Sequence, residues 1–328
     1  MFFDITRMDR RPGVPDSDLY GLVRPTTALK KLKRLWGPIF LFHSTGPRHK
    51  VRIRMGSIPL EDNFNDIVGK AQRGMKLSDA DLASRAGVSP DAIGKVKGGE
   101  ADETALRKLA PILKLAPDAL VQSAKKGWAP PSLQVNGLAQ FNTAYEDMTV
   151  NCYLAWDPKS KEAVAFDTGA DSGPMLRLAK ERELTIKLIL LTHTHPDHIA
   201  DLGRLRKETN APAHVCLLEP VSGAEGFSAG KSFQVGALKI ETRQTSGHSK
   251  GGITFVISGL ERPVAVVGDA LFAGSMGGGM ISWDDALGNN RKHIFSLPDD
   301  TVICPGHGPL TTVREEKRHN PFYPEFKN

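Results

Sequence analysis

Two histidines stand two residues apart at the end of an apolar run in the stretch LILLTHTHPDHIADL, residues 188–202. In an extended chain, alternate side chains point to the same face, so the imidazoles of His193 and His195 are able to converge on one point. Neutral imidazole is a common ligand for zinc and other transition metals. The spacing therefore predicts part of a metal site directly after a buried strand.

A second pair of polar residues follows at once. Pro196 ends the extended run, and Asp197 and His198 open the next helix, where they are able to face a second point close to the first. The junction between a strand end and a helix start is a usual place for a site in an α/β sheet. A histidine and a carboxylate together suit zinc, iron or manganese.

Three further motifs place polar side chains just past buried-looking strands. His248 lies in the loop TSGHSKGG, Asp269 ends the apolar strand of VAVVGDALF, and His307 ends the strand of VICPGHGPL. Taken singly, such a histidine is usually a hydrogen-bonded structural residue, and such an aspartate is usually a turn residue. Taken together, one metal centre explains all seven side chains, whereas structural roles would need seven separate explanations. We therefore predict a shared metal centre.

An alternating pattern from residue 135 onward would position these side chains. The predicted strands are 149–156, 162–167, 187–191, 213–217, 237–243, 252–258, 263–268 and 301–304. Helices are predicted at 172–183, at 198–209 and around 284–296. Strands that alternate with helices indicate a layered α/β domain over residues 135–328.

The residues before this domain divide into three parts. Residues 60–126 predict helices throughout, and Ser78 with Asp81 forms a capping-box pattern at one helix start. The Pro-rich stretch GWAPPSLQ, residues 127–134, predicts a linker. Residues 1–59 show no sustained period. We expect them to form a disordered basic extension, or to precede a true translation start at Met55.

Charge and cysteine content limit the partners and the compartment. The net charge is +6, but residues 1–54 hold twelve Lys and Arg against four Asp, so the remaining chain is slightly acidic. No apolar run reaches the roughly 20 residues of a membrane span, and we expect no membrane partner. Three widely spaced cysteines form no disulfide framework, which favours a reducing compartment such as the cytoplasm.

In their order and spacing, the motifs THTHPDH, GHS, GD and PGHG resemble the metallo-β-lactamase superfamily, and within it the hydroxyacylglutathione hydrolases (glyoxalase II) and their short bacterial relatives. The resemblance covers about residues 135–325 and implies a four-layer αββα sandwich. It also implies two divalent metal ions, with zinc the first expectation and iron or manganese the alternatives.

The resemblance assigns three residues to each metal site and one carboxylate to a bridge between them: His193, His195 and His248; Asp197, His198 and His307; and Asp269. Asp197 and Asp269 are therefore candidate catalytic residues as well as ligands. Asp167, in FDTGA, matches an aspartate near the metal-binding loop that would hold a ligand in place. A strand-ending turn residue is the alternative for Asp167.

The activity that the resemblance implies is hydrolysis of a small-molecule thioester or related acyl ester. Two metal ions roughly 3.5–4 Å apart share a water, and the resulting hydroxide attacks the carbonyl carbon. Lys250, Arg314 and Lys317 are candidates for holding an acidic substrate tail, with solvated surface charge as the alternative for each.

Two departures from glyoxalase II put glutathione itself in question. Few residues follow the last motif, so we expect no C-terminal helical domain of the kind that helps hold glutathione. The stretch ALFAGSMGGGM, residues 270–280, also lacks the arginine of the Gly-Arg-Ser/Thr-Asp element. Neither departure touches the metal ligands.

Residues 77–99 resemble the lambda-repressor-like helix-turn-helix domain, and the match extends over about 65–122. The recognition helix would begin with Ser89 and Asp91 and carry Lys95 and Lys97 further along. Direct base readout needs Arg, Lys, Asn or Gln at that start, and the basic excess of the segment is small. DNA binding is therefore one hypothesis, and a helical module that forms a homodimer or covers the active-site cleft is the other.

Two other functions remain open. A persulfide dioxygenase shares the fold but uses a single iron, and the motif PGHG at residues 305–308 favours the hydrolase over it. A transcriptional regulator could use a hydrolase-like domain to sense a metabolite. The complete set of seven ligands argues against a domain that only senses.

Overall fold

The computed structural model describes residues 58–327. The predicted extension, residues 1–59, therefore lies almost entirely outside the described residues. Within the described part of the chain, no helix is long and apolar enough to cross a membrane.

Five helices occupy the stretch for which helices are predicted: α1 (Phe64–Gly74), α2 (Asp79–Ala86), α3 (Pro90–Lys97), α4 (Glu103–Ile112) and α5 (Pro117–Ala124). The predicted capping box is present, with the hydroxyl of Ser78 accepting from the backbone N–H of Asp81 at 3.1 Å. Ser89 caps α3 in the same way before its first residue, Pro90. Gly87, at φ +61°, makes the turn that joins the two helices.

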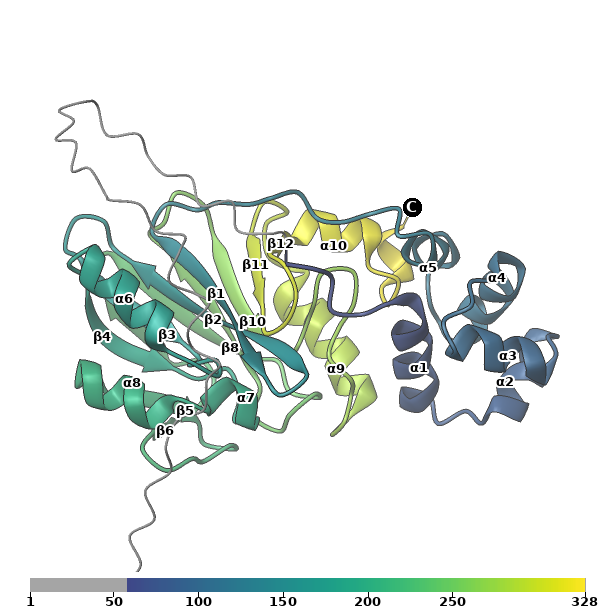
Figure 1. Ribbon diagram of the computed structural model, residues 1–328, viewed down its shortest axis with the longest axis horizontal. Coiled ribbons are helices and arrows are strands. Elements are labelled where there is room, and N and C mark those ends of the chain that lie inside the picture. Colours follow the sequence, from purple (N-terminus) through teal and green to yellow (C-terminus); the bar gives the residue numbers. More distant parts are fainter. Residues whose placement is uncertain (1–57, 328) are drawn as a thin grey trace, which may run out of the picture. The chain divides into compact units, whose positions relative to one another are not determined.

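Two six-stranded sheets form the centre of the remaining described chain (Figure 1). The first contains, in order, β1 (Leu138–Tyr145), β2 (Met148–Trp156), β3 (Glu162–Phe166), β4 (Thr185–Leu190), β5 (Ala213–Cys216) and β6 (Glu225–Phe227). The second contains β12 (Thr311–Thr312), β11 (Val302–Pro305), β10 (Val264–Gly268), β9 (Ile253–Ser258), β8 (Leu238–Gln244) and β7 (Ser232–Val235). The strands β3 to β6 run parallel, as do β10 and β11, so several carboxyl ends of strands share an edge.

Helices cover the outer faces of both sheets. The helices are α6 (Gly173–Glu181), α7 (Pro196–Ile199), α8 (Leu202–Thr209), α9 (Trp283–Asn289) and α10 (Val313–His319), with a π-helical turn at Asn290–Ile294 and a 3₁₀ turn at Pro324–Phe326. One apolar cluster lies between the two sheets and contains Phe166 and Phe255, whose rings are 5.4 Å apart. A second lies between the first sheet and the helices α6 and α8. Burying a large apolar side chain of this kind contributes roughly 1.5–3 kcal/mol.

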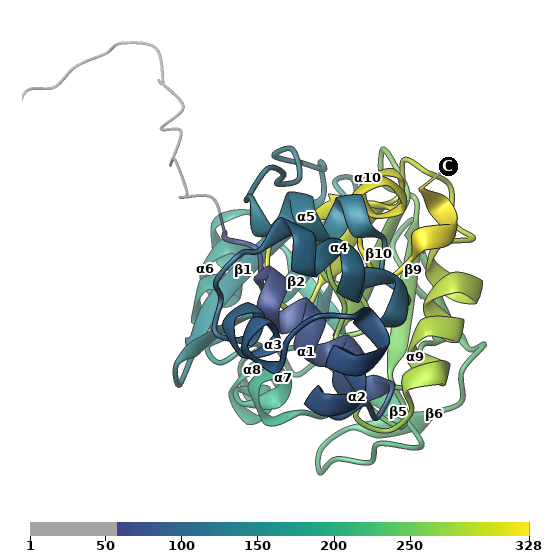
Figure 2. The same ribbon diagram turned by 90° about the vertical axis from the view of Figure 1, so that its right-hand side faces the viewer.

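A third apolar cluster joins the five N-terminal helices to the second sheet. Phe64 and Ile67 of α1 belong to the same cluster as Met276 and Phe322 of the α/β part. Figure 2 shows the helices α1 to α5 in front of this sheet. The backbone N–H of Ala116 donates to the carbonyl of Pro321 at 2.8 Å. The helices therefore share a core with the α/β part.

The predicted strands and helices are found with small shifts, but four strands and one helix escape the sequence pattern. The missed strands are β1, β6, β7 and β12, and the missed helix is α10. β1 is an edge strand whose residues are mostly half-buried, so it lacks the alternation that marks a strand with one buried face. β6 and β12 are only three and two residues long. The predicted helix at 198–209 is in fact two helices, α7 and α8, separated at Ala200 and Asp201.

Candidate metal centre

The predicted ligands follow four different strands, and all lie in loops except Asp197 and His198, which belong to the short helix α7. The His193 loop follows β4 of the first sheet, whereas the loops of His248, Asp269 and His307 follow β8, β10 and β11 of the second. The two sheets face one another, so these loops meet at one edge of the interface between them. Residues more than 100 positions apart in the chain are thereby brought to one place.

The structure brings all seven predicted ligands together in two adjacent groups. The first group is His193, His195, His248 and Asp269, and the second is Asp197, His198 and His307. Within each group the potential ligand atoms all lie within 4.8 Å of one another. The second group is buried, whereas in the first His193 and Asp269 are buried and His195 and His248 are partly exposed.

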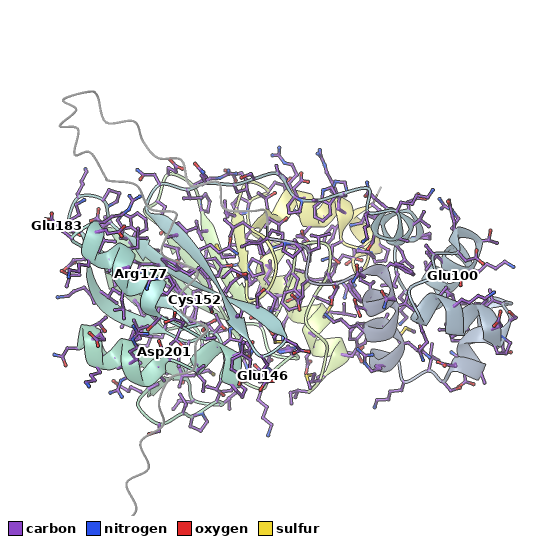
Figure 3. The ribbon with its side chains drawn as sticks, viewed as in Figure 1. Glu100, Glu146, Cys152, Arg177, Glu183 and Asp201 are labelled. Carbon is purple, nitrogen blue, oxygen red and sulfur yellow. The ribbon has the colours of Figure 1, made fainter. Side chains whose placement is uncertain are left out.

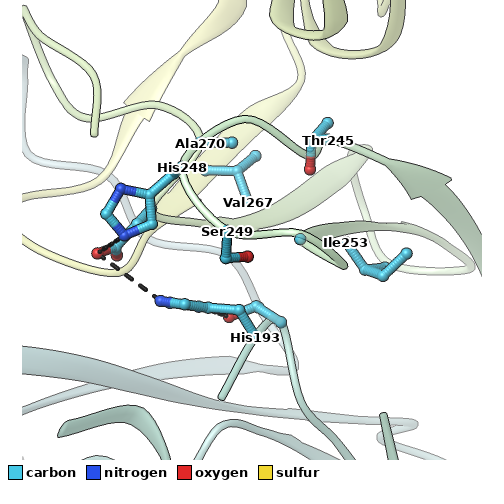
Figure 4. Close-up of a pocket in the computed structure, with 10 residues that line it drawn as sticks. His193, Thr245, His248, Ser249, Ile253, Val267 and Ala270 are labelled. Atoms are coloured by element: carbon cyan, nitrogen blue, oxygen red, sulfur yellow. Dashed lines mark hydrogen bonds and ion pairs between the residues drawn. The ribbon is translucent and has the colours of Figure 1, made fainter. Parts of the chain in front are cut away.

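Asp269 lies where the two groups meet. Its Oδ2 atom is 3.3 Å from Nε2 of His248 in the first group and 3.4 Å from Nε2 of His307 in the second. Its Oδ1 atom is 3.2 Å from Nε2 of His198. One carboxylate thus faces both groups, which is the position that a bridging ligand needs. Figure 4 shows His193 and His248 at a cleft beside this carboxylate, with dashed lines for their contacts.

Three buried atoms of the candidate ligands make no well-aligned hydrogen bond in the described part of the chain: Nε2 of His193, and Nε2 of His198 and Oδ1 of Asp269, which lie 3.2 Å apart. Leaving a buried polar atom without a partner costs about 1–3 kcal/mol, more for a charged group. Imidazole nitrogens and a carboxylate that converge in this state are the donor set that a divalent transition metal prefers. These residues therefore fit a metal centre.

The other ring nitrogen of four ligand histidines is held by a neighbour. Nδ1 of His193 is 3.0 Å from the Thr192 hydroxyl, and Nδ1 of His248 is 3.0 Å from the carbonyl of Gly278. Nδ1 of His307 is 2.7 Å from the carbonyl of Thr149. Such contacts fix ring orientation and leave Nε2 to face the site. His195 differs, because its Nδ1 atom faces the site and lies 3.1 Å from Nε2 of His248.

Asp167 holds the fourth of these histidines. Its Oδ2 atom is 2.9 Å from Nδ1 of His198 and also accepts from the Thr192 hydroxyl, and its Oδ1 atom accepts from the Thr192 N–H at 2.7 Å. The backbone of Asp167 has φ +55°, a left-handed conformation that residues other than glycine seldom adopt. The surrounding structure sustains this strain at a residue that positions a ligand.

Sequence reasoning missed two residues that tie the ligand loops together. The buried carboxylate of Glu219 accepts from the N–H of Thr194 at 2.7 Å and from that of Gly251 at 2.9 Å, and so links the loops of the two sheets. The amide of Asn151 donates to the carbonyls of Pro305 and Gly308 on either side of His307. Neither residue has a motif of its own. Only the position of Glu219, just after a strand, hinted at a role.

Burial and neighbouring charges shift the pKa values of the ligands in two directions. Burial lowers the pKa of His193 and of His248. Burial also opposes the charging of His198 and His307, but the carboxylate of Asp269 outweighs it and raises their pKa values to about 10 and about 11. These two histidines in turn hold the pKa of Asp269 well below its usual range, against the effect of burial. Asp269 therefore stays ionised beside two protonated imidazoles, whose protons a bound cation would displace.

The structure does not bring two of the three predicted substrate-binding residues to this site. The ammonium of Lys317 is 2.8 Å from the carboxylate of Asp299, which precedes β11, whereas His307 follows the other end of that strand. The backbone N–H of Arg314 donates to the carbonyl of the same Asp299. Both contacts lie at the end of β11 opposite to His307, so the structure shows no contact of Arg314 or Lys317 with the candidate ligands. Lys250 is exposed two residues after His248 and is the one that remains beside the site.

The predicted DNA-reading residues lie on the exposed side of α3 and are engaged locally. Lys95 forms an ion pair with Asp91, four residues earlier on the same helix, at 3.2 Å. Lys97 forms one with Asp79 of α2 at 2.8 Å. The hydroxyl of Ser89 accepts from the N–H of Ala92 and so caps the helix. These contacts do not require a nucleic acid.

With the fold and the site in place, comparison with known proteins identifies the class. The model of the metallo-β-lactamase superfamily matches residues 145–307, which include all seven candidate ligands. The chain is 33% identical to the human mitochondrial persulfide dioxygenase ETHE1 over 182 residues, which cover 52% of this chain and 69% of that protein. The chain belongs to the metallo-β-lactamase superfamily.

Other relatives differ in their activities. Hydroxyacylglutathione hydrolase GloC of Haemophilus influenzae is 28% identical over 52% of this chain and 92% of its own length. The crystal structure of the BLEG-1 B3 metallo-β-lactamase is 29% identical and has a TM-score of 0.51 over 56% of this chain and 98% of that one. The superfamily supports a metal-dependent enzyme of hydrolase type, and these relatives leave the specific reaction open.

Proposed function

We propose that the protein is a dinuclear metal-dependent hydrolase of a thioester or related acyl ester. The observation that carries the proposal is the meeting of two ligand groups at the single buried carboxylate of Asp269. Two divalent ions held there would lower the pKa of a water toward ~7 and polarise a carbonyl oxygen. Zinc is the metal that we expect first, because the donor set of histidines with carboxylates suits it.

The residues of the chain would divide the work as follows. His193, His195 and His248 would hold one ion. Asp197, His198 and His307 would hold the other, with Asp269 between the two groups. Asp167 would keep Nε2 of His198 directed at the site, since it holds the opposite nitrogen of that ring. The carboxylates of Asp197 and Asp269 would accept a hydrogen bond from the attacking water and orient it.

The choice between a thioester and an amide depends on whether the leaving group must be protonated. A thiolate leaves without a proton, so a thioester needs no general acid, whereas an amide would need one. Lys250 lies beside the His248 loop and is a candidate for contact with a carboxylate or carbonyl of the leaving group. A thioester therefore suits this site better than an amide.

The second candidate function is a persulfide dioxygenase, and the 33% identity to the human enzyme of that name supports it. Such an enzyme would use one iron. The second ligand group favours the hydrolase, because Nε2 of His307 lies 3.3 Å from Oδ2 of Asp197 in a complete three-residue site.

Metal analysis with parallel activity assays tests the proposal. The full chain is reconstituted separately with zinc, iron and manganese, and each form is assayed with a panel of thioesters and with glutathione persulfide under oxygen. We expect about two ions per chain, thioester hydrolysis and no oxygen uptake. One iron per chain with oxygen uptake would establish the dioxygenase instead.

The matched variants are His195→Ala and His293→Ala. His195 belongs to the first ligand group, whereas His293 lies in the π-helical turn and belongs to neither group. We expect His195→Ala to abolish hydrolysis in a folded protein and His293→Ala to leave it unchanged. Full activity in His195→Ala would contradict the proposed site.

A further inference from the structure

In the described part of the chain, five large apolar residues are exposed, with exposed fractions between 43% and 74%. They lie in three short segments near the candidate metal centre: Met148; Leu217 and Leu218; and Met280 and Ile281. Scattered exposed apolar residues are ordinary in proteins, but a group that surrounds one site marks a binding surface. Each segment is tied to a ligand loop by hydrogen bonds.

The first segment is the hairpin between β1 and β2. Met148 precedes Thr149, whose carbonyl lies 2.7 Å from Nδ1 of His307. Figure 3 labels Glu146 in the turn of this hairpin, and Asp147 follows it. Both acidic residues are exposed. The hairpin therefore presents an apolar side chain next to the second ligand group, together with negative charge that would repel an anionic group.

The second segment is the loop before α9. The carbonyl of Gly278 accepts from Nδ1 of His248 at 3.0 Å, and the N–H of Ile281 donates to the carbonyl of Gly247 at 2.9 Å. A Cβ atom on Gly277 would lie 2.9 Å from Nδ1 of His248, so the loop runs directly against that ring. Met280 and Ile281 are the most exposed point of this loop, at 74% and 55%.

The third segment follows β5. Leu217 and Leu218 come immediately before Glu219, whose carboxylate accepts from the N–H of Thr194, between the histidines of the first group. The same carboxylate accepts from the N–H of Gly251 in the His248 loop. The backbone of the two leucines therefore leads into the residue that joins these loops, and the exposed side chain of Leu217 lies beside Gly226 of β6.

We propose that these five side chains form an apolar rim that binds the acyl group of the substrate, and that this group is apolar. The inference rests on the proposed function, because it assigns the group attached to the attacked carbonyl carbon. The three segments are hydrogen-bonded to the loops of both ligand groups, so the acyl chain of a substrate whose carbonyl carbon lies between the groups comes within reach of the rim. The acidic residues of the hairpin turn disfavour an anionic acyl group, and burial of the rim favours an apolar one.

A series of acyl chains on one leaving group tests the rim by kinetics. The substrates are acetyl, butyryl, hexanoyl and octanoyl thioesters of N-acetylcysteamine, hydrolysed by the metal-loaded full chain. A fully buried methylene contributes a factor of about four, so half-burial should raise kcat/KM about twofold for each methylene. We expect the ratio of hexanoyl to acetyl kcat/KM to be at least about tenfold. A flat series would overturn the proposal.

Two double variants and a control locate the effect. Met280→Ser with Ile281→Ser, and Leu217→Ser with Leu218→Ser, should each reduce the hexanoyl-to-acetyl ratio severalfold. Leu260→Ser is the control, since this half-buried leucine lies in the turn between β9 and β10, at the other end of those strands from the site. Its ratio should equal that of the wild type. An unchanged ratio in both double variants would also overturn the proposal.

A binding measurement separates this inference from the proposed function. Calorimetric titration with acetate, hexanoate and octanoate measures the affinity of the protein for acyl chains without turnover. We expect this affinity to rise with chain length. Length-dependent binding without thioester hydrolysis would support the rim and contradict the proposed reaction. Thioester hydrolysis without any dependence on acyl-chain length would support the proposed reaction and contradict the rim. If the double variants instead convert a dimer into a monomer, with no change in length dependence, the rim is an interface between two copies.

Discussion

The candidate metal centre and the exposed helices α2 and α3 differ in whether their polar side chains have hydrogen-bond or ion-pair partners. At the centre, buried ligand atoms such as Nε2 of His193 have no partner in the described part of the chain. On the two helices, polar side chains are exposed and satisfy one another, as Lys97 does with Asp79. Buried polar atoms without a hydrogen-bond partner indicate a site for a ligand. Exposed side chains that already form ion pairs need no ligand to account for them.

A third region, α1 and the residues before it, connects the helices to the centre. Gly308 follows His307, and a Cβ atom placed on it would lie 3.3 Å from the backbone nitrogen of Glu61. Lys70 forms an ion pair with Asp62 and donates to the carbonyl of Met276 at 2.9 Å. The helical segment is therefore fastened to the ligand loops through α1, while α2 and α3 face outward.

The largest effect is expected from removing the helical segment. The predicted linker at 127–134 suggests that a chain starting at Gly127 keeps its activity. The shared apolar core predicts the opposite, because such a chain would expose Met276 and Phe322. We expect low solubility and a loss of bound metal, measured against a chain that starts at Met55. A soluble, active chain with two metal ions would show that the segment is a separable module.

A smaller effect is expected from Lys70→Met in the full chain. Asp62 is buried, so the loss of its partner should cost about 3–5 kcal/mol of unfolding free energy. The double variant Asp62→Asn with Lys70→Met should recover most of this loss, because no charge is then left buried. Denaturant unfolding of the single and double variants measures both values. Equal stability of wild type and Lys70→Met would mean that α1 is not held by this pair.

Glu316 should make stability depend on pH. Burial raises the pKa of this carboxyl from 4.5 to about 7, although Asn320, Thr311 and Gly274 donate hydrogen bonds to it. The folded state then keeps a proton that the unfolded state releases. The contribution of Glu316 is therefore fully present below pH about 4.5 and is lost as the pH rises to about 7, by about 3 kcal/mol in total.

The measurement compares unfolding free energies of wild type and Glu316→Gln between acidic and mildly basic pH. The wild type should lose stability relative to the variant across this range, whatever the absolute difference between them. Glu315→Gln is the matched control, since Glu315 is the preceding residue and contacts Trp128 and His319 at a less buried position. If the difference between wild type and Glu316→Gln is the same at every pH, the carboxyl titrates normally.

The smallest effect is expected from the lysines of α3. Lys95 and Lys97 are already paired with aspartates of the same segment, so they offer little free positive charge to a phosphate backbone. We expect the variant with both lysines changed to alanine to unfold at the same temperature as the wild type. We also expect no binding to duplex DNA at physiological salt, by fluorescence anisotropy. Tight binding that the two substitutions abolish would revive the helix-turn-helix hypothesis.

The sequence by itself determined which residues are candidate metal ligands. His193, His195 and His198 are neighbours in the chain, and the strand-to-helix junction that displays them is encoded locally by an apolar run and a proline. The capping box at Ser78 and the turn at Gly87 are equally local, so they too could be read directly. Such features depend on contacts between residues a few positions apart.

Only the tertiary structure decided how these local pieces combine. Asp269 faces both ligand groups because β10 lies beside β11 in a sheet that packs on another, and no local pattern records that pairing. The same holds for Glu219, which links two loops, and for Lys317, which pairs with Asp299. The core shared by α1 and the second sheet was hidden for the same reason. An apolar helix face indicates that another element must pack against it, and only the folded chain shows that this element is the second sheet.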